Sequence, residues 1–341
     1  MEKPLVALVR SPNAALSREL VQLAAKQRDL QQHSRADNTL DAYESDWKGF
    51  CAWLSIKVDG ADPLQASQKT VAMYLTWLVE TPVVVRGKPR QRKASAISRA
   101  ATGIFFMRQE LDAPLMRFKN DPISQTLSGI RRKLGVAFAQ KRAIDDQDLA
   151  RMAAAYDPSK LRDVRNLAIL LVGWYAANRR SEVVALEVPD VVFEPGGMRI
   201  TLRRSKTDQE GASFEKGVKY AKNTSVCAVR ALRRWLDMAD LHEGPIFRGF
   251  TRSGELRKQA LSDQIVADVV KEACRRIGLD PLQYSGHSLR SGFATTAAKK
   301  GVSLKKIMDQ TGHKSERVAL GYIRSAGLLG DDNPTDGLVD P

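Results

Sequence analysis

Large apolar side chains recur at steps of three and four from Asn38 onward, and this spacing restricts the possible folds more than any other feature. The first series is Leu40, Tyr43, Trp47, Phe50 and Leu54. Such spacing places the series on one face of a helix that begins at Asn38 or Thr39. Further helices with the same spacing are expected after the Asp62-Pro63 break, at 94–110 and at 123–134. The sequence therefore predicts an all-helical bundle over residues 36–134.

The second half of the chain is also mainly helical, with one change of pattern. Residues 161–177 are strongly apolar and predict a buried helix. Beyond Pro195-Gly196-Gly197, the side chains of Met198, Ile200 and Leu202 alternate with polar ones, which predicts a small antiparallel sheet. The remaining helices are expected at 145–155, 226–239, 262–277, 287–300 and 304–311.

These patterns predict a mainly α fold with two domains. The expected segments are an N-terminal extension at 1–35 with a polar helical stretch, a helical domain at 36–134, a basic linker at 135–144, a mostly helical domain with one small sheet at 145–330, and a tail at 331–341.

The charge balance suggests the kind of partner. Lys and Arg number 54 against 39 Asp and Glu, which gives a formal net charge of +15. A chain this basic favours a nucleic-acid backbone as partner, and an anionic membrane surface is the alternative. No apolar run approaches the roughly 18 residues of a spanning helix, and the start of the chain lacks a signal-peptide pattern. We therefore expect a cytoplasmic protein with no membrane partner.

The sequence offers no motif for a metal or a nucleotide. Cys51, Cys227 and Cys274 stand far apart and fit neither a zinc site nor a disulfide framework. No paired histidine and carboxylate motif and no glycine-rich phosphate loop occurs. We expect an enzyme that works without metal or other cofactor.

Basic segments are the candidate DNA contacts. The run from Arg86 to Lys93 has five basic residues and no acidic one, and it fits a solvated loop or a contact with a DNA backbone. The candidates in this run, the following helix, the linker and the strand turn are Arg86, Lys88, Arg90, Arg92, Lys93, Ser95, Ser98, Arg99, Arg131, Arg132, Lys133, Lys141, Arg142, Arg203 and Arg204.

Two short motifs place charged side chains on neighbouring helical positions. Arg179 and Glu182 are three residues apart at the end of the apolar helix, so Glu182 can orient the guanidinium. His287 and Arg290 repeat the spacing. Either pair alone also fits an ordinary surface pair.

Further residues complete a chemical set. His313 follows Gly312, Tyr322 comes nine residues later, and Lys206 follows the strand. Arginines clamp phosphate oxygens, histidine handles a phenol proton, and tyrosine forms a covalent intermediate. Together these residue types are what cleavage of a phosphodiester by a tyrosine requires.

The order of these motifs resembles the tyrosine recombinase (phage integrase) family. The motifs are Arg179-x-x-Glu182, Lys206, His287-x-x-Arg290, Gly312-His313 and Tyr322. The helix from Asn38 to Leu54 resembles the family's SAM-like core-binding domain, and the resemblance covers residues 36–326. It is strongest to simple recombinases of the Cre and Xer type. It implies a C-shaped two-domain clamp around duplex DNA.

The resemblance also implies a role for each catalytic candidate. Tyr322 attacks the scissile phosphate and leaves a 3′-phosphotyrosyl link and a free 5′-hydroxyl. Lys206 protonates the leaving oxygen. The residues that hold the phosphate or support its cage are Arg179, Arg290, His287, His313 and Glu182. The alternative lysines are Lys216, Lys219 and Lys222, and the rival phenols are Tyr220 and Tyr284.

The resemblance further implies how the protein assembles on its substrate. It implies double-stranded DNA with an inverted-repeat target site, a dimer on each site, and a homotetramer that joins two sites. Strands then exchange through a Holliday junction, with no ATP, no metal and no required accessory protein.

Two features depart from the family pattern. Asn178 occupies a position that is usually apolar, and the tail after Tyr322 is poor in helix formers. Alternatives therefore stay open: a catalytically impaired DNA-binding protein of the same fold, an integrase that needs accessory factors, or a relaxing enzyme of the topoisomerase kind.

Overall fold

The computed structural model describes Leu23, Lys26 and residues 37–85, 87–135, 141–203, 213–313, 315–317 and 319–321. The chain forms two compact units, Met1–Ala139 and Gln140–Pro341. Almost all of the expected extension at 1–35 and the whole tail at 331–341 lie outside the described residues.

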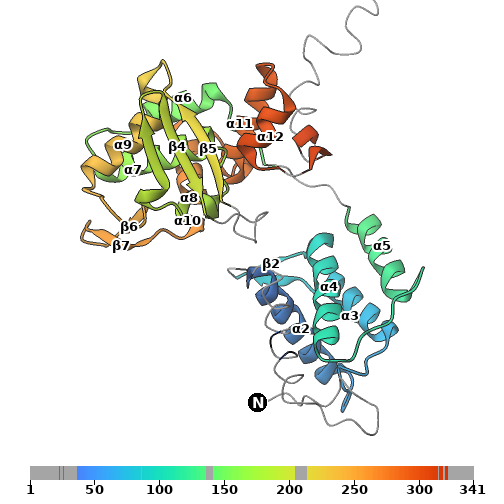
Figure 1. Cartoon of the computed structure of the whole chain (residues 1–341). Helices are drawn as coiled ribbons and strands as arrows, with labels where there is room; N and C mark the ends of the chain where they lie inside the picture. The colour runs from blue at the N-terminus through green and yellow to red at the C-terminus, as the bar shows by residue number, and fades with distance from the viewer. Residues whose placement is uncertain are drawn as a thin grey trace, which may run out of the picture. The chain divides into compact units, whose positions relative to one another are not determined.

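The first unit contains the predicted helical bundle (Figure 1). Its helices are α2 (Asp37–Lys57), α3 (Gln68–Glu80), α4 (Ala94–Glu110) and α5 (Pro122–Leu134). Helix α2 packs on α4, and α3 packs on α5. Phe50, Leu75 and Ile97 are fully buried between them. The prediction of apolar helix faces in this region is confirmed.

The basic run after α3 is a hairpin rather than the loop we expected. Strand β1 (Val83–Val85) pairs antiparallel with β2 (Lys88–Arg90). Three consecutive β-branched valines favour a strand, and Gly87 adopts the positive φ of 76° that a tight turn requires. The hairpin leaves Lys88 and Arg90 exposed.

The second unit surrounds a three-stranded antiparallel sheet with helices (Figure 1). The sheet order is β3 (Val191–Glu194), β4 (Gly197–Leu202) and β5 (Phe214–Lys219). The helices are α6 (Asp146–Ala154), α7 (Leu161–Tyr175), α8 (Arg180–Val184), α9 (Ala228–Met238), α10 (Asp263–Arg276), α11 (His287–Lys299) and α12 (Leu304–Thr311). A second hairpin, β6 (Arg248–Phe250) with β7 (Leu256–Ala260), was not anticipated from the sequence.

The alternation in the sheet follows the predicted pattern in β4 but not in β5. Met198, Ile200 and Leu202 of β4 point into the core as predicted. In β5 the inward positions include Lys216, which is opposite Ile200 and only 2% exposed. A lysine on the inward face breaks the apolar alternation, so the sequence pattern did not reveal this strand.

Helix α11 is fixed against α7 by close backbone packing. A Cβ atom at Gly292 would lie only 1.9 Å from the Ile144 carbonyl oxygen. That carbonyl accepts a hydrogen bond of 2.8 Å from Trp174 Nε1, and the Ile144 amide donates to the Ser288 carbonyl at 3.1 Å. These contacts set the position of α11 and therefore of its first turn.

Across the part of the chain that the structure describes, every helix is too short or too polar to cross a lipid bilayer.

Replacement of Gly292 tests the importance of this packing. We expect Gly292→Ala to lower the free energy of unfolding of the second unit by about 1–3 kcal/mol, because the added methyl group overpacks the contact. Gly129→Ala is the control, because Gly129 lies in α5 with nothing within 4 Å of an added Cβ. It should raise helix stability by about 0.5–1 kcal/mol. Urea unfolding followed by hydrogen exchange in α11 and α5 measures both, and an unchanged α11 would contradict the packing argument.

Candidate active site

The turn after α7 brings Arg179 into the site. Ala177 adopts a left-handed conformation with φ of 49°, and the Asn178 amide donates to the Gly173 carbonyl at 3.1 Å. A non-glycine residue in this conformation costs about 1–2 kcal/mol, so the turn must be held by other contacts. Arg290 Nη1 supplies one of them by donating to the Ala177 carbonyl at 2.8 Å.

Glu182 holds both the backbone and the guanidinium of Arg179. Arg179 precedes α8 and donates its amide to Glu182 Oε2 at 2.8 Å and its Nη1 to Glu182 Oε1 at 2.5 Å. Burial raises the pKa of Glu182, but Lys216 and Arg179 together hold that pKa below its usual range. Glu182 is therefore an ionised clamp, and the Arg179 side chain stays 22% exposed.

Arg290 joins the α7 turn to the end of α12. Its residue is 1% exposed, and its Nη2 lies 3.2 Å from His313 Nε2. A guanidinium has no acceptor, so Nε2 of His313 must accept and Nδ1 must carry the proton. Nδ1 lies 2.8 Å from Thr311 Oγ1, which itself donates to the Ile307 carbonyl at 2.7 Å. This chain of hydrogen bonds fixes the His313 tautomer.

The end of α12 is tied to the rest of the site. Gln310 Nε2 donates to the Tyr175 carbonyl at 2.9 Å and to the Gly217 carbonyl at 3.3 Å. Gly312 ends the helix in the left-handed conformation with φ of 64°, which turns the chain so that His313 faces Arg290. Helices α7 and α12 and strand β5 therefore meet at one point.

The histidines are neutral near pH 7. Desolvation and the guanidinium groups of Arg290 and Arg179 lower the pKa of His313 to about 4. Desolvation and the same two groups, with Arg180, also lower the pKa of His287. His287 begins α11 and is largely exposed, so its ring is accessible from solvent.

Lys216 is a member of the site that the sequence offered only as an alternative to Lys206. Its Nζ donates to the Ala176 carbonyl at 2.8 Å and to Asn178 Oδ1 at 2.7 Å, and it lies 3.9 Å from Glu182 Oε2. Burial, together with the charges of Arg290 and Arg179, lowers the pKa of Lys216 to about 7, although Glu182 opposes this. The only signal for it in the sequence was its period-two spacing with Val218.

The structure brings together five of the predicted catalytic residues: Arg179, Glu182, His287, Arg290 and His313. The other two, Lys206 and Tyr322, lie outside the described residues. Of the alternatives, Lys219 and Lys222 are exposed, Tyr220 is half-buried, and Tyr284 is 1% exposed.

The predicted DNA contacts fall into different structural settings. Arg86 and Arg204 lie outside the described residues. The exposed candidates without a hydrogen bond or ion pair discussed here are Lys88, Arg90, Lys93, Ser95, Arg131 and Arg132, and Ser98 is half-buried.

The other basic candidates contact the protein itself. Arg92 donates to the Thr81 carbonyl at the end of α3, and Lys141 donates to the Leu282 carbonyl. The Arg142 amide donates to the Gln283 carbonyl at 2.8 Å. The ion-paired candidates are Arg99 with Asp46, Lys133 with Glu80, and Arg203 with Glu187 and Asp190.

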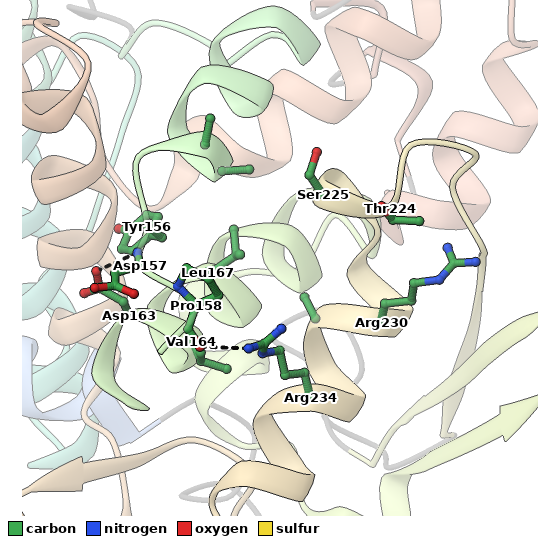
Figure 2. A pocket seen from close by; sticks show the side chains of 13 residues that line it. Tyr156, Asp157, Pro158, Asp163, Val164, Leu167, Thr224, Ser225, Arg230 and Arg234 are labelled. Atoms are coloured by element: carbon green, nitrogen blue, oxygen red, sulfur yellow. Dashed lines mark hydrogen bonds between the residues drawn. The ribbon is translucent and has the colours of Figure 1, made fainter. Parts of the chain in front are cut away.

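A pocket of about 430 Å³ lies elsewhere on the second unit, between the α6–α7 connection and the start of α9 (Figure 2). Tyr156, Arg230 and Arg234 contribute to its lining, and Arg234 donates to the Pro158 carbonyl at 2.9 Å. None of the five assembled catalytic residues lines it. Within the described residues, no group of three or more His, Cys, Asp or Glu side chains gathers as a metal site would require.

The assembled residues form a centre for an anion that has several oxygens. Two guanidinium groups are held in place by internal acceptors, and two neutral imidazoles lie beside them. Arginine forks match phosphate oxygens and stabilise the charge that develops during phosphoryl transfer. The geometry therefore defines a phosphate-binding centre of the type that breaks DNA strands.

Comparison with known proteins agrees with this chemistry. The model of the "Phage integrase family" matches residues 142–327, more than half of the chain. An integrase/recombinase XerD homologue of Selenomonas ruminantium is 37% identical over 314 residues, covering 92% of this chain and 89% of that protein. Recombinase Cre of Escherichia phage P1 is 28% identical over 212 residues, covering 58% of this chain and 59% of that protein.

A solved structure shares the fold. The crystal structure of a lambda integrase dimer bound to a COC′ core site matches with a TM-score of 0.60 at 17% identity, covering 90% of this chain and 77% of that one. The chain belongs to the phage integrase family. It is a tyrosine-type site-specific recombinase, and the predicted family and mainly helical fold class are confirmed.

The His313 tautomer can be tested directly. We expect nitrogen NMR of the imidazole to show the neutral Nδ1–H form at pH 6, because His313 titrates at a pKa of about 4. Thr311→Val removes the Oγ1 acceptor and should weaken the preference for that tautomer. Thr296→Val, at a buried position of α11, is the control and should leave the His313 signals unchanged. A charged His313 ring at pH 6 would contradict the assignment.

Proposed function

We propose that Tyr322 is the nucleophile and that Arg179 and Arg290 hold the scissile phosphate. The phenol oxygen forms a bond to phosphorus, the bond from phosphorus to the 5′-oxygen breaks, and Lys206 gives that oxygen a proton. The 5′-hydroxyl of another strand reverses the reaction, so no net bond energy is lost. The observation that carries this proposal is the convergence of the two guanidinium groups with His287 and His313.

The two histidines have different roles in this proposal. His313 uses Nε2 to accept from Arg290 and therefore positions that guanidinium. His287 is exposed, and its lowered pKa leaves the ring neutral near pH 7. A neutral imidazole can accept the phenol proton as Tyr322 attacks.

We further propose that the substrate is duplex DNA with an inverted-repeat site, bound in the bacterial cytoplasm by one dimer per site. Two sites then join in a homotetramer, and strands exchange through a Holliday junction without accessory proteins. Two structural relatives support this assembly. One is a lambda integrase tetramer bound to a Holliday junction, and another is XerH bound to a palindromic difH substrate.

The nucleophile is tested with a substrate selected for this protein. Binding to a random duplex library, followed by recovery of bound DNA, gives a site from which a nicked suicide substrate is made. We expect the unaltered protein to form a covalent adduct that denaturing gels retain. Tyr322→Phe should abolish the adduct and leave DNA affinity unchanged, because only the reactive oxygen is lost.

Other outcomes distinguish the alternatives. An adduct with Tyr322→Phe would mean that another residue is the nucleophile. Binding without any adduct from the unaltered protein would indicate a DNA-binding protein that has lost cleavage. Plasmid relaxation without recombinant product would indicate the topoisomerase-like alternative.

The exposed basic hairpin supports a backbone contact that salt dependence can measure. We expect Lys88→Ala with Arg90→Ala to weaken binding across sequences and to lower the slope of log affinity against log salt by about 2, one for each lost phosphate contact. Lys48→Ala is the control, since Lys48 is equally exposed but pairs with Glu44 on α2. An unchanged slope in the double variant would place the hairpin away from DNA.

A further inference from the structure

We propose that Lys216 and Asn178 form a positioning pair that holds the turn before Arg179 and keeps Arg179 and Glu182 in the geometry that binds phosphate. This inference rests on the proposed function and extends it to two residues that never touch the substrate. Both are buried: Asn178 is 1% exposed, and Lys216 is 2% exposed. They are positioning residues rather than catalytic residues.

The contacts of Lys216 span the whole turn. From β5, its Nζ donates to the Ala176 carbonyl at 2.8 Å and to Asn178 Oδ1 at 2.7 Å. Ala177, between these two partners, has the left-handed conformation. Lys216 therefore restrains the turn from the sheet side, and Arg290 restrains it through the Ala177 carbonyl.

The residue type at position 178 follows from this contact. An ammonium group only donates, so the amide oxygen of Asn178 must face it. An apolar side chain at 178 would leave a buried ammonium with one acceptor fewer, and such a group is costly to leave unsatisfied. The departure from the family pattern at Asn178 is therefore the matching half of a buried pair with Lys216.

The pair also acts on Glu182 through charge. The charged groups around Glu182 are Arg179 at the start of α8, Lys216 on β5 and Arg290 on α11, with His287 and His313 beside them. Lys216 is the largest influence that opposes burial at this carboxyl group. Without it, we expect the pKa of Glu182 to rise, so that Arg179 loses its ionised partner as the pH falls.

The first experiment is a pH profile of adduct formation with saturating suicide substrate. We expect Lys216→Met to react about tenfold more slowly than the unaltered protein near pH 6 and to approach it near pH 8.5, where Glu182 is ionised again. DNA affinity should change little. Lys216→Arg keeps the charge and should restore part of the rate near pH 6. Lys160→Met removes an exposed lysine from the same unit and should match the unaltered protein at both pH values.

A double variant keeps the test valid if Lys216→Met folds poorly. Asn178→Leu with Lys216→Met replaces the buried polar pair by an apolar one, and such replacements are often tolerated. We expect it to be more stable than the sum of the single variants predicts, which a double-mutant cycle measures. It should still show the slow reaction near pH 6, because Glu182 still lacks Lys216.

A measurement without DNA separates this inference from the proposed function. Carbon NMR of the Glu182 carboxyl group, assigned with Glu182→Gln, should show a raised pKa in the double variant. A folded double variant with an unchanged Glu182 pKa, or with a rate loss equal at both pH values, would overturn the positioning role. Failure of the unaltered protein to form an adduct would overturn the proposed function instead.

Discussion

The guanidinium of Arg290 is the contact on which the rest of the site depends. It is almost completely buried and donates to the Ala177 carbonyl from one nitrogen and to His313 Nε2 from another. One side chain of α11 thus holds the strained turn that presents Arg179 and the end of α12 that presents His313. Burying a cation is expensive unless its donors are satisfied, so these contacts form together or not at all. The close packing of α11 at Gly292 is what places Arg290 at the required depth.

The same concentration of positive charge explains the unusual titration of the site and its fitness for phosphate. Arg290 and Arg179 both lower the pKa of His313 and of Lys216. Because those groups are partly desolvated, the field that disfavours a further proton favours an anion. Glu182 is the negative group that offsets part of this field, and it faces Arg179 and Lys216. The net result is a positive centre in which the imidazoles remain neutral.

Local pattern predicted most of this fold, and long-range contact accounts for what it could not predict. The helix from Ala94 to Glu110 was expected with those bounds because its apolar spacing is regular. Strand β5 was missed because Lys216 interrupts its inward face. The order of the motifs identified Arg179 and Arg290, but their contact depends on a turn that closes between elements more than a hundred residues apart. For Lys206 and Tyr322 the sequence prediction stands as a prediction.

Asn178 shows why a single departure from a family pattern is weak evidence for lost activity. Considered alone, a polar residue at this position suggests a damaged centre. In the folded chain its oxygen faces Lys216, which lies 38 positions later on another element. Among the described residues Asn178 Nδ2 has no acceptor, and an unsatisfied buried donor costs about 1–3 kcal/mol. A chain that keeps such a cost beside its reactive arginine has a compensating use for the amide oxygen, and the ammonium group of Lys216 provides it. The substitution therefore favours an active centre supported in a different way over a binding protein that has lost its chemistry.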